Sequence, residues 1–220
     1  MLVRNLIKDS IPPLKTSDTA ARALQWMNEF RHSHFPVIGN NGFMGMVHQS
    51  DLEKVENKEV PLLTLSIPFT RLFVNEYMHL LDAVKFASNN EFTLVPVLSE
   101  TEQYLGCISI MEIIHALAES HSVQNPGGIV VLGIEKNKYN LSEISRIVEA
   151  EGAQVLSSSA TVTTDPEKIE VTLKVNRIDL TRILAGFFRN GFDVKASYHQ
   201  SEFQQDIQTR FDEFMNYLKM

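Results

Sequence analysis

Two acidic side chains stand at matching places in a repeated stretch of the sequence. Asp51 lies three residues after His48, and Glu112 lies three residues after Ser109; His48 and Ser109 each follow a glycine and two apolar residues. An ionised carboxylate accepts hydrogen bonds and can hold both hydroxyls of a ribose diol when its position is fixed. A carboxylate in the first turn of a helix also stabilises that helix without any ligand, so a capping role is the alternative for both acids.

Few side chains in the sequence are suited to holding a phosphate. Lys15, Thr16 and Ser17 precede the first predicted helix, and Arg71 and Asn75 occupy the related part of the second copy. Phosphate binding is favoured by backbone N–H groups, by hydroxyls and above all by lysine or arginine. With so few cations, we expect a lightly charged ligand rather than a triphosphate.

The other reactive residue types point to structure rather than to chemistry. Cys107, the one cysteine, lies in the apolar run 105–110, which indicates a buried structural thiol. His32, His34 and His48 flank the first pair of predicted strands, but no cysteine or carboxylate stands beside them at ligand spacing, so we expect no metal site. The sequence has no nucleophile elbow, no glycine-rich phosphate loop and no setting for a reactive thiol, so we expect neither an enzyme nor a catalytic cofactor.

The repeat also predicts the elements that position the two acids. Residues 34–38 form a predicted buried strand, residues 40–42 a turn, and residues 45–48 a second strand that leads into a helix. The same order returns about sixty residues later, over residues 94–113. Residues 11–14 should form an extended strand before the first helix, and residues 62–67 and 69–74 the equivalent strands of the second copy. The helix over residues 111–120 should turn Ile113 and Ile114 inward. Two copies of one unit indicate an internal duplication whose halves pack together, so the two acids should face related clefts.

This strand-turn-strand-helix pattern resembles the cystathionine beta-synthase (CBS) domain, and two tandem copies over about residues 1–122 resemble the CBS pair. The resemblance implies that an adenosine-containing molecule binds in the clefts between the copies: AMP, ADP, ATP or S-adenosylmethionine. It implies that Asp51 and Glu112 take the ribose hydroxyls and that Ser109 helps to hold phosphate. His48 stands at the hydroxyl position of the first copy and would contact the ligand by stacking or a hydrogen bond. The expected ligand-binding set also includes Lys15, Thr16 and Arg71.

The strongest predicted domain boundary is a proline followed by two glycines, within residues 125–128. We therefore expect a CBS pair over residues 1–124, with one copy over about 1–60 and the other over about 61–124. A second domain should follow over residues 125–200.

The second domain has the predicted order strand, helix, strand, strand, helix, strand, with its first helix over residues 141–151. This is the order of the split ferredoxin-like motif. This order resembles the ACT domain, a module that in its family binds amino acids or dimerises. Residues 135–140, which join the first strand to the first helix, contain no glycine. Because many ligand-binding members of that family have a glycine there, we expect a dimerising or a degenerate role rather than amino-acid binding.

Residues 201–220 predict an amphipathic C-terminal helix, whose apolar stripe must be buried on its own domain or on a partner subunit. The chain is 44% hydrophobic and 21% charged, which is a globular composition, and no long apolar run or signal-peptide pattern occurs. We therefore expect a cytoplasmic protein that does not enter the membrane. The net charge of −7 argues against nucleic-acid binding.

The expected fold class is thus α/β for the CBS pair and α+β, ferredoxin-like, for the second domain. This order of modules resembles the bacterial acetoin-utilisation accessory proteins. We expect a homodimeric regulator in which the adenosine ligand shifts the relation between the two parts and so the state of an unidentified partner protein. The alternative is a non-catalytic scaffold whose clefts are empty or filled by side chains.

Overall fold

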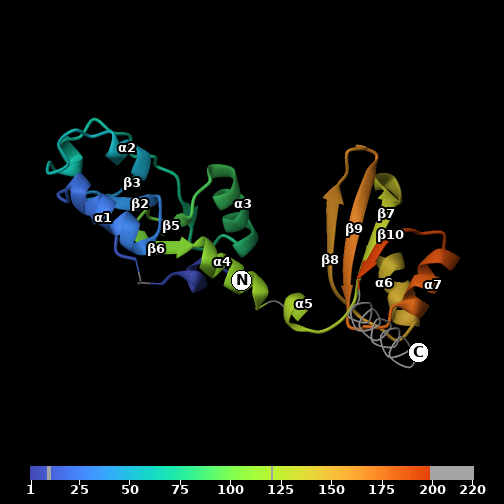
Figure 1. Ribbon diagram of the computed structural model, residues 1–220. Helices are drawn as coiled ribbons and strands as arrows, with labels where there is room; N and C mark the ends of the chain where they lie inside the picture. The colour runs from blue at the N-terminus through green and yellow to red at the C-terminus, as the bar shows by residue number, and fades with distance from the viewer. Residues whose placement is uncertain (9–10, 120, 199–220) are drawn as a thin grey trace, which may run out of the picture. The chain divides into compact units, whose positions relative to one another are not determined.

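The computed structural model describes residues 1–8, 11–119 and 121–198, and the chain divides into two compact units, Met1–Ala118 and Glu119–Met220 (Figure 1). Both units mix helices with β-sheet, so the fold is mixed α/β. None of the helices in the described part of the chain has the length and apolar character needed to cross a membrane.

The first copy in the first unit is a three-stranded sheet with helices. Its elements are β1 (Leu14–Lys15), α1 (Ala20–Phe30), β2 (His34–Gly39), β3 (Gly42–His48) and α2 (Gln49–Glu53). Strand β1 pairs in parallel with β2, and β2 pairs antiparallel with β3. Thr19 begins α1 by accepting a hydrogen bond from the backbone N–H of Arg22, which satisfies one of the unpaired donors of the first turn.

The second copy repeats this plan closely. Its elements are β4 (Val74–Asn75), α3 (Leu80–Asn90), β5 (Leu94–Leu98), β6 (Tyr104–Ser109) and α4 (Ile110–Ala118), again with one parallel and one antiparallel pairing. Arg31 and Glu91 end the related helices α1 and α3 in the left-handed conformation, at φ 58° and 55°. Gly45 and Gly106 have φ values of 144° and 142° in the related strands. The two copies therefore share unusual backbone conformations at related positions, as a duplication requires.

The segment that precedes each copy packs on the other copy. We call these two segments, residues 3–7 and 62–68, the lead segments. The short helix η1 (Val3–Leu6) precedes copy one, yet the N–H of Val3 donates to the carbonyl of Met78, and Val3 is buried in the core of copy two. The short helix η2 (Leu62–Thr64) precedes copy two, yet the N–H of Leu62 donates to the carbonyl of Asp18, and Leu62 is buried in the core of copy one. This exchange ties the copies into one folding unit.

The segments that lead into β1 and β4 contain less strand than the sequence predicted. Residues 11–14, 62–67 and 69–74 were expected to be extended strands, but β-structure is confined to Leu14–Lys15 and Val74–Asn75 apart from isolated bridges. Four prolines lie within or directly beside these segments and lack the N–H that a strand ladder needs. The prolines are Pro12, Pro13, Pro61 and Pro68.

The two copies also share one apolar cluster, which contains Phe43 and Met46 of copy one with Phe92, Leu94 and Cys107 of copy two, among others. Burial raises the pKa of the Cys107 thiol to about 12, and its sulfur lies 3.2 Å from the hydroxyl oxygen of Tyr104. The predicted burial of this thiol is therefore confirmed, and the raised pKa disfavours the reactive thiolate.

The second unit contains one antiparallel sheet of strand order β10-β7-β9-β8. Helices α6 and α7 pack against one face of this sheet, and Ile144, Ile147 and Phe187 of these helices contribute to the core (Figure 1). The elements are α5 (His121–Gln124), β7 (Ile129–Glu135), η3 (Lys136–Lys138), α6 (Leu141–Ala150), β8 (Val155–Val162), β9 (Lys168–Val175), α7 (Thr181–Arg189) and β10 (Asp193–Tyr198).

Gly127, in the predicted linker, has a packing role. A Cβ atom there would lie 1.9 Å from the carbonyl oxygen of Val175, so only glycine fits against β9. The adjacent Gly128 donates its N–H to the carbonyl of Arg177. The predicted helix over residues 201–220 lies outside the described residues.

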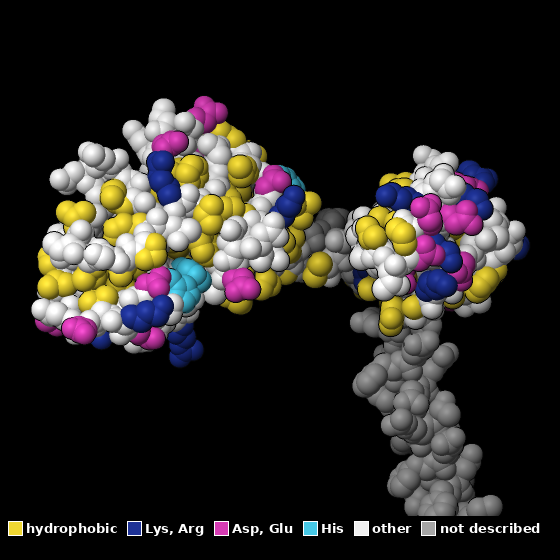
Figure 2. All heavy atoms as spheres, turned by 90° about the horizontal axis from the view of Figure 1, so that it is seen from above, with side chains coloured by type: hydrophobic (Ala, Val, Ile, Leu, Met, Phe, Trp, Pro, Cys, Tyr) yellow, Lys and Arg dark blue, Asp and Glu magenta, His cyan; other side chains and the backbone are white. Residues whose placement is uncertain are grey.

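Figure 2 shows one face of the described surface. Lys and Arg side chains are interspersed there with Asp and Glu side chains. On this face the charges do not form the broad basic patch that nucleic-acid binding requires.

Candidate functional site

Asp51 of α2 lines a shallow pocket in the first unit. The pocket has a volume of about 340 Å³ and lies between the end of α2 and the segment that follows η2. It contains one carboxylate, one ammonium group, one hydroxyl and four apolar side chains. The lining residues are Asp51, Lys54, Val55, Leu65, Ser66, Ile67 and Pro68. Such a surface can take an apolar ring together with a diol and one anionic group.

The carboxylate of Asp51 is held loosely. Lys54 Nζ lies 3.3 Å from Asp51 Oδ1, and the two side chains are 75% and 28% exposed. An exposed ion pair of this kind contributes only about 0–1 kcal/mol, so a ligand can displace it at small cost. The N-terminus of α2 is capped instead by His48, whose Nδ1 accepts a hydrogen bond from the N–H of Ser50 at 3.0 Å. Asp51 is therefore oriented towards the pocket while its helix is capped by another residue.

Glu112 of α4 is bound differently. Its Oε2 accepts a hydrogen bond from the N–H of Ser109 at 2.6 Å, and the N–H of Glu112 donates to Ser109 Oγ at 3.2 Å. This reciprocal pair is a capping box, in which both side chains satisfy backbone donors at the start of a helix. Ser109 and Glu112, two of the residues predicted to bind ligand in copy two, are thus already hydrogen-bonded to each other's backbone.

The histidines of copy one form a ring cluster at the contact with copy two. The His34 ring lies 4.3 Å from the His48 ring and 4.8 Å from the Phe92 ring, measured between centroids. His32 Nδ1 lies 3.3 Å from Thr93 Oγ1. Burial, with a smaller contribution from His48, lowers the pKa of His34 to about 4, and burial also lowers the pKa of His32.

This cluster does not assemble a metal site. Among the described residues, no three His, Cys, Asp or Glu side chains are grouped so that they could hold a metal ion. His48 does not line the Asp51 pocket, because its ring packs on His34 and its Nδ1 caps α2. Its expected contact with a ligand therefore stays a prediction.

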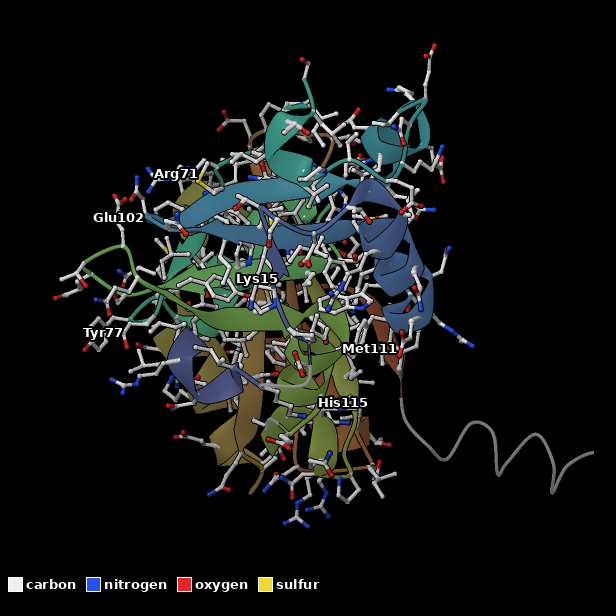
Figure 3. All side chains as sticks on the ribbon, turned by 90° about the vertical axis from the view of Figure 1, so that its left-hand side faces the viewer. Lys15, Arg71, Tyr77, Glu102, Met111 and His115 are labelled. Carbon is white, nitrogen blue, oxygen red and sulfur yellow. The ribbon has the colours of Figure 1, made fainter. Side chains whose placement is uncertain are left out.

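The remaining predicted residues lie apart from the Asp51 pocket lining. Lys15 is exposed, and the methyl group of Thr16 lies near Gly39 of β2. Arg71 pairs with Glu102 and lies over the Phe73 ring at 5.9 Å. Figure 3 shows Arg71 beside Glu102 and away from Lys15. The structure thus does not bring Lys15, Thr16 and Arg71 together with Asp51 in one pocket.

Lys54 and the segment from Leu65 to Pro68 are pocket residues that sequence reasoning missed. Lys54 lies three residues after the predicted acid, one helical turn away, so helical spacing could have identified it. The second segment had no such signal, because its position depends on the exchange of lead segments between the copies.

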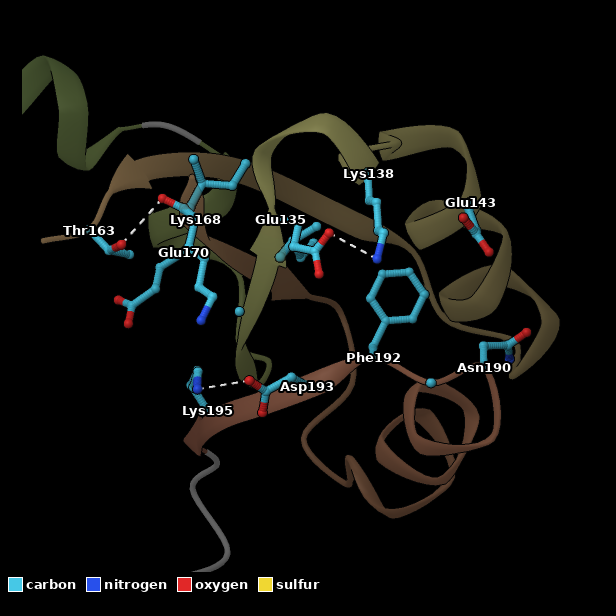
Figure 4. A pocket seen from close by; sticks show the side chains of 14 residues that line it. Glu135, Lys138, Glu143, Thr163, Lys168, Glu170, Asn190, Phe192, Asp193 and Lys195 are labelled. Carbon is cyan, nitrogen blue, oxygen red and sulfur yellow. Dashed lines mark hydrogen bonds and ion pairs between the residues drawn. The ribbon is translucent and has the colours of Figure 1, made fainter. Parts of the chain in front are cut away.

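A second pocket, of about 510 Å³, lies in the second unit at the end of β7 and the start of β10 (Figure 4). Its charged side chains are of both signs, and two pairs are made within it: Lys195 with Asp193 at 2.7 Å, and Lys138 with Glu135 at 2.9 Å. Phe192, Ile134 and Ile169 supply apolar surface. The charges of this pocket are thus largely balanced by one another.

Comparison with known proteins agrees with the geometry of the first copy. Residues 3–57 match the CBS domain family, and this stretch contains Asp51 and η1 but ends before the second copy.

Several solved structures resemble the chain at low identity. They include a CBS domain pair/ACT domain protein from Thermotoga maritima (20% identity, 55% of this chain and 99% of that chain, TM-score 0.49). Another is the CBS domains of a transcriptional regulator from Streptococcus pneumoniae (21% identity, 52% of this chain and 98% of that chain, TM-score 0.46). A third is CBSX2 in complex with AMP (20% identity, 54% of this chain and 96% of that chain, TM-score 0.46).

Proposed function

We propose that this chain is a non-catalytic regulatory protein that senses an adenosine-containing molecule, and that the molecule binds in the Asp51 pocket. The observation that carries this proposal is the placement of Asp51. It is a carboxylate in the part of the chain that matches the CBS domain, and it faces a pocket beside one cation and an apolar wall. A carboxylate in that setting can accept both hydroxyls of a ribose.

The rest of the pocket favours a ligand with little charge. Leu65, Ile67 and Pro68 offer an apolar wall on which a planar base can pack, and Lys54 is the single cation in the lining. One ammonium group compensates one phosphate rather than three. AMP therefore fits better than ADP, and ADP better than ATP, whereas S-adenosylmethionine carries no phosphate for Lys54 to pair with.

Signal transmission is part of the same proposal. Ligand binding favours one arrangement of the two copies, and the second unit, acting as an ACT-like dimerisation domain, passes the change to a regulated partner protein. The chain then works as a cytoplasmic homodimer. Measurement of the molar mass by light scattering, with and without nucleotide, tests this part.

Binding is tested by thermal unfolding and calorimetry with AMP, ADP, ATP and S-adenosylmethionine. A ligand that binds the folded state raises its melting temperature as concentration increases. The matched variants are Asp51→Asn and Glu56→Gln, since each removes one negative charge and Glu56 is exposed outside the pocket lining. We expect Asp51→Asn to weaken binding by about 10- to 100-fold, the value of a charge-assisted hydrogen bond, and Glu56→Gln to leave it unchanged.

The competing function is a scaffold whose clefts bind nothing. It would be supported if none of the four compounds raised the melting temperature of the wild-type protein at millimolar concentration. Equal binding by Asp51→Asn and wild type would reject the Asp51 pocket as the site.

A further inference from the structure

The two copies carry different side chains at related positions, although their backbones correspond. The N–H of Leu63 donates to the carbonyl of Thr16, and the N–H of Arg4 donates to the carbonyl of Glu76, both at 3.0 Å. These related hydrogen bonds show that Glu76 of copy two occupies the place of Thr16 in copy one, and that Arg4 occupies the place of Leu63. A hydroxyl in one copy is therefore replaced by a carboxylate in the other.

The carboxylate that takes the place of Thr16 in copy two is already paired. Arg4 lies 3.6 Å from Glu76, whose side chain is only 14% exposed, and the Arg4 guanidinium lies 5.5 Å from the centroid of the Tyr77 ring. Glu112 accepts a backbone hydrogen bond in its capping box. A ribose diol at Glu112 would have to replace that bond.

The lead segments reinforce this difference. Leu65 and Ser66 line the open pocket beside Asp51. In copy two the related lead segment places Ile7 against the sheet, where a Cβ on Gly106 would lie 2.6 Å from Ile7 Cγ2. Leu6 and Ile7 pack on the core of copy two. Leu65 and Ile67 pack on the core of copy one in the same way, and among the described residues the lead segment of copy one also forms a pocket wall.

We infer that each chain binds one adenosine ligand, in the Asp51 pocket, and that copy two is a structural counterpart whose acid serves the fold. This inference rests on the proposed function and adds its stoichiometry and its site. The ligand acts on one copy, and the other provides the fixed half against which copy one moves. A homodimer accordingly carries two ligands rather than four.

Calorimetric titration with AMP, ADP, ATP and S-adenosylmethionine tests the inference on the full chain. We expect one mole of the compound that binds per mole of wild-type chain. Asp51→Asn should lose affinity by about 10- to 100-fold, whereas Glu112→Gln should bind within about twofold of wild type. Native mass spectrometry of the wild-type protein gives the same count without any variant, so it decides the matter even if a variant folds poorly.

The outcomes separate the inference from the proposed function. Two moles per chain, or loss of binding in Glu112→Gln with wild-type binding in Asp51→Asn, would overturn the inference and leave an adenosine sensor. Absence of binding by all four compounds would overturn the proposed function, and the inference with it.

Discussion

The imidazole rings of His34 and His48 lie 4.3 Å apart across the β2–β3 pairing, where the two residues are direct register partners. The related partners in copy two are Leu94 and Ser109, which carry no titratable group. The duplication has thus given copy one a pair of ionisable rings where copy two has an apolar and a hydroxyl side chain. His34 also contacts Phe92, so its protonation affects the packing between the copies.

We predict that acid destabilises the first unit through these histidines. The pKa of His34 is lowered in the folded protein to about 4, so between pH 6.5 and 4 the unfolded chain binds more protons than the folded chain. Stability should therefore fall as the pH drops below about 6.5, by on the order of 1 kcal/mol per pH unit at most, discounted for the partial exposure of the ring. Thermal unfolding at closely spaced pH values measures this slope.

The control for this prediction is His34→Leu, which copies the residue found in copy two. The variant should show a shallower loss of stability between pH 6.5 and 5. The neighbouring His32, whose pKa is also lowered, should retain part of the slope. An unchanged pH profile in His34→Leu would assign the acid sensitivity elsewhere.

The capping box of Glu112 predicts a stability effect that needs no ligand. Glu112→Ala removes a hydrogen bond to the N–H of Ser109, and we expect a loss of about 0.5–2 kcal/mol. Asp51→Ala removes an exposed ion pair and should cost less, about 0–1 kcal/mol. Denaturant titration of the ligand-free variants compares the two, and a larger loss for Asp51→Ala would contradict the assigned roles.

The related glycines of β3 and β6 predict unequal costs for the same substitution. A Cβ on Gly45 would lie 2.9 Å from the backbone carbon of Phe69, whereas a Cβ on Gly106 would meet a side-chain atom, Ile7 Cγ2, at 2.6 Å. Both glycines have positive φ, so both alanine variants are strained. We expect Gly45→Ala to be the more destabilising by at least about 1 kcal/mol. Gly42→Ala, with positive φ and open space around it, measures the strain alone.

Much of the first unit could be predicted because its signals are local and occur twice. The glycine, two apolar residues, polar residue and acid at matching spacing predicted β3–α2 and β6–α4, and the helix expected to begin near residue 141 is found at Leu141–Ala150. The pattern also predicted a buried Cys107. Repetition supplied a second, independent copy of each weak local signal.

Side-chain partners were less predictable, since they depend on contacts between distant segments. Ile114 was expected to face inward with Ile113, but it is 49% exposed whereas Ile113 is buried. Arg71 was expected near the ligand because of its place in the repeat, yet Glu102, thirty-one residues away, pairs with it. The capping box at Glu112 was foreseen as the alternative to ligand binding, but sequence alone did not distinguish it from the open setting of Asp51.

Lys54 finally predicts how the pocket distinguishes ligands by charge. It is the single cation of the pocket lining, and its Nζ already lies 3.3 Å from the carboxylate that should hold the ribose. Lys54→Gln should therefore weaken AMP binding by about 3- to 10-fold, since a solvent-exposed charge pair contributes about 1 kcal/mol, while the binding of uncharged adenosine should change little. The ratio of the two dissociation constants, measured by calorimetry at low and high salt, isolates the charge effect, which salt should reduce. Equal weakening of AMP and adenosine would mean that Lys54 acts by positioning Asp51 rather than by contacting phosphate.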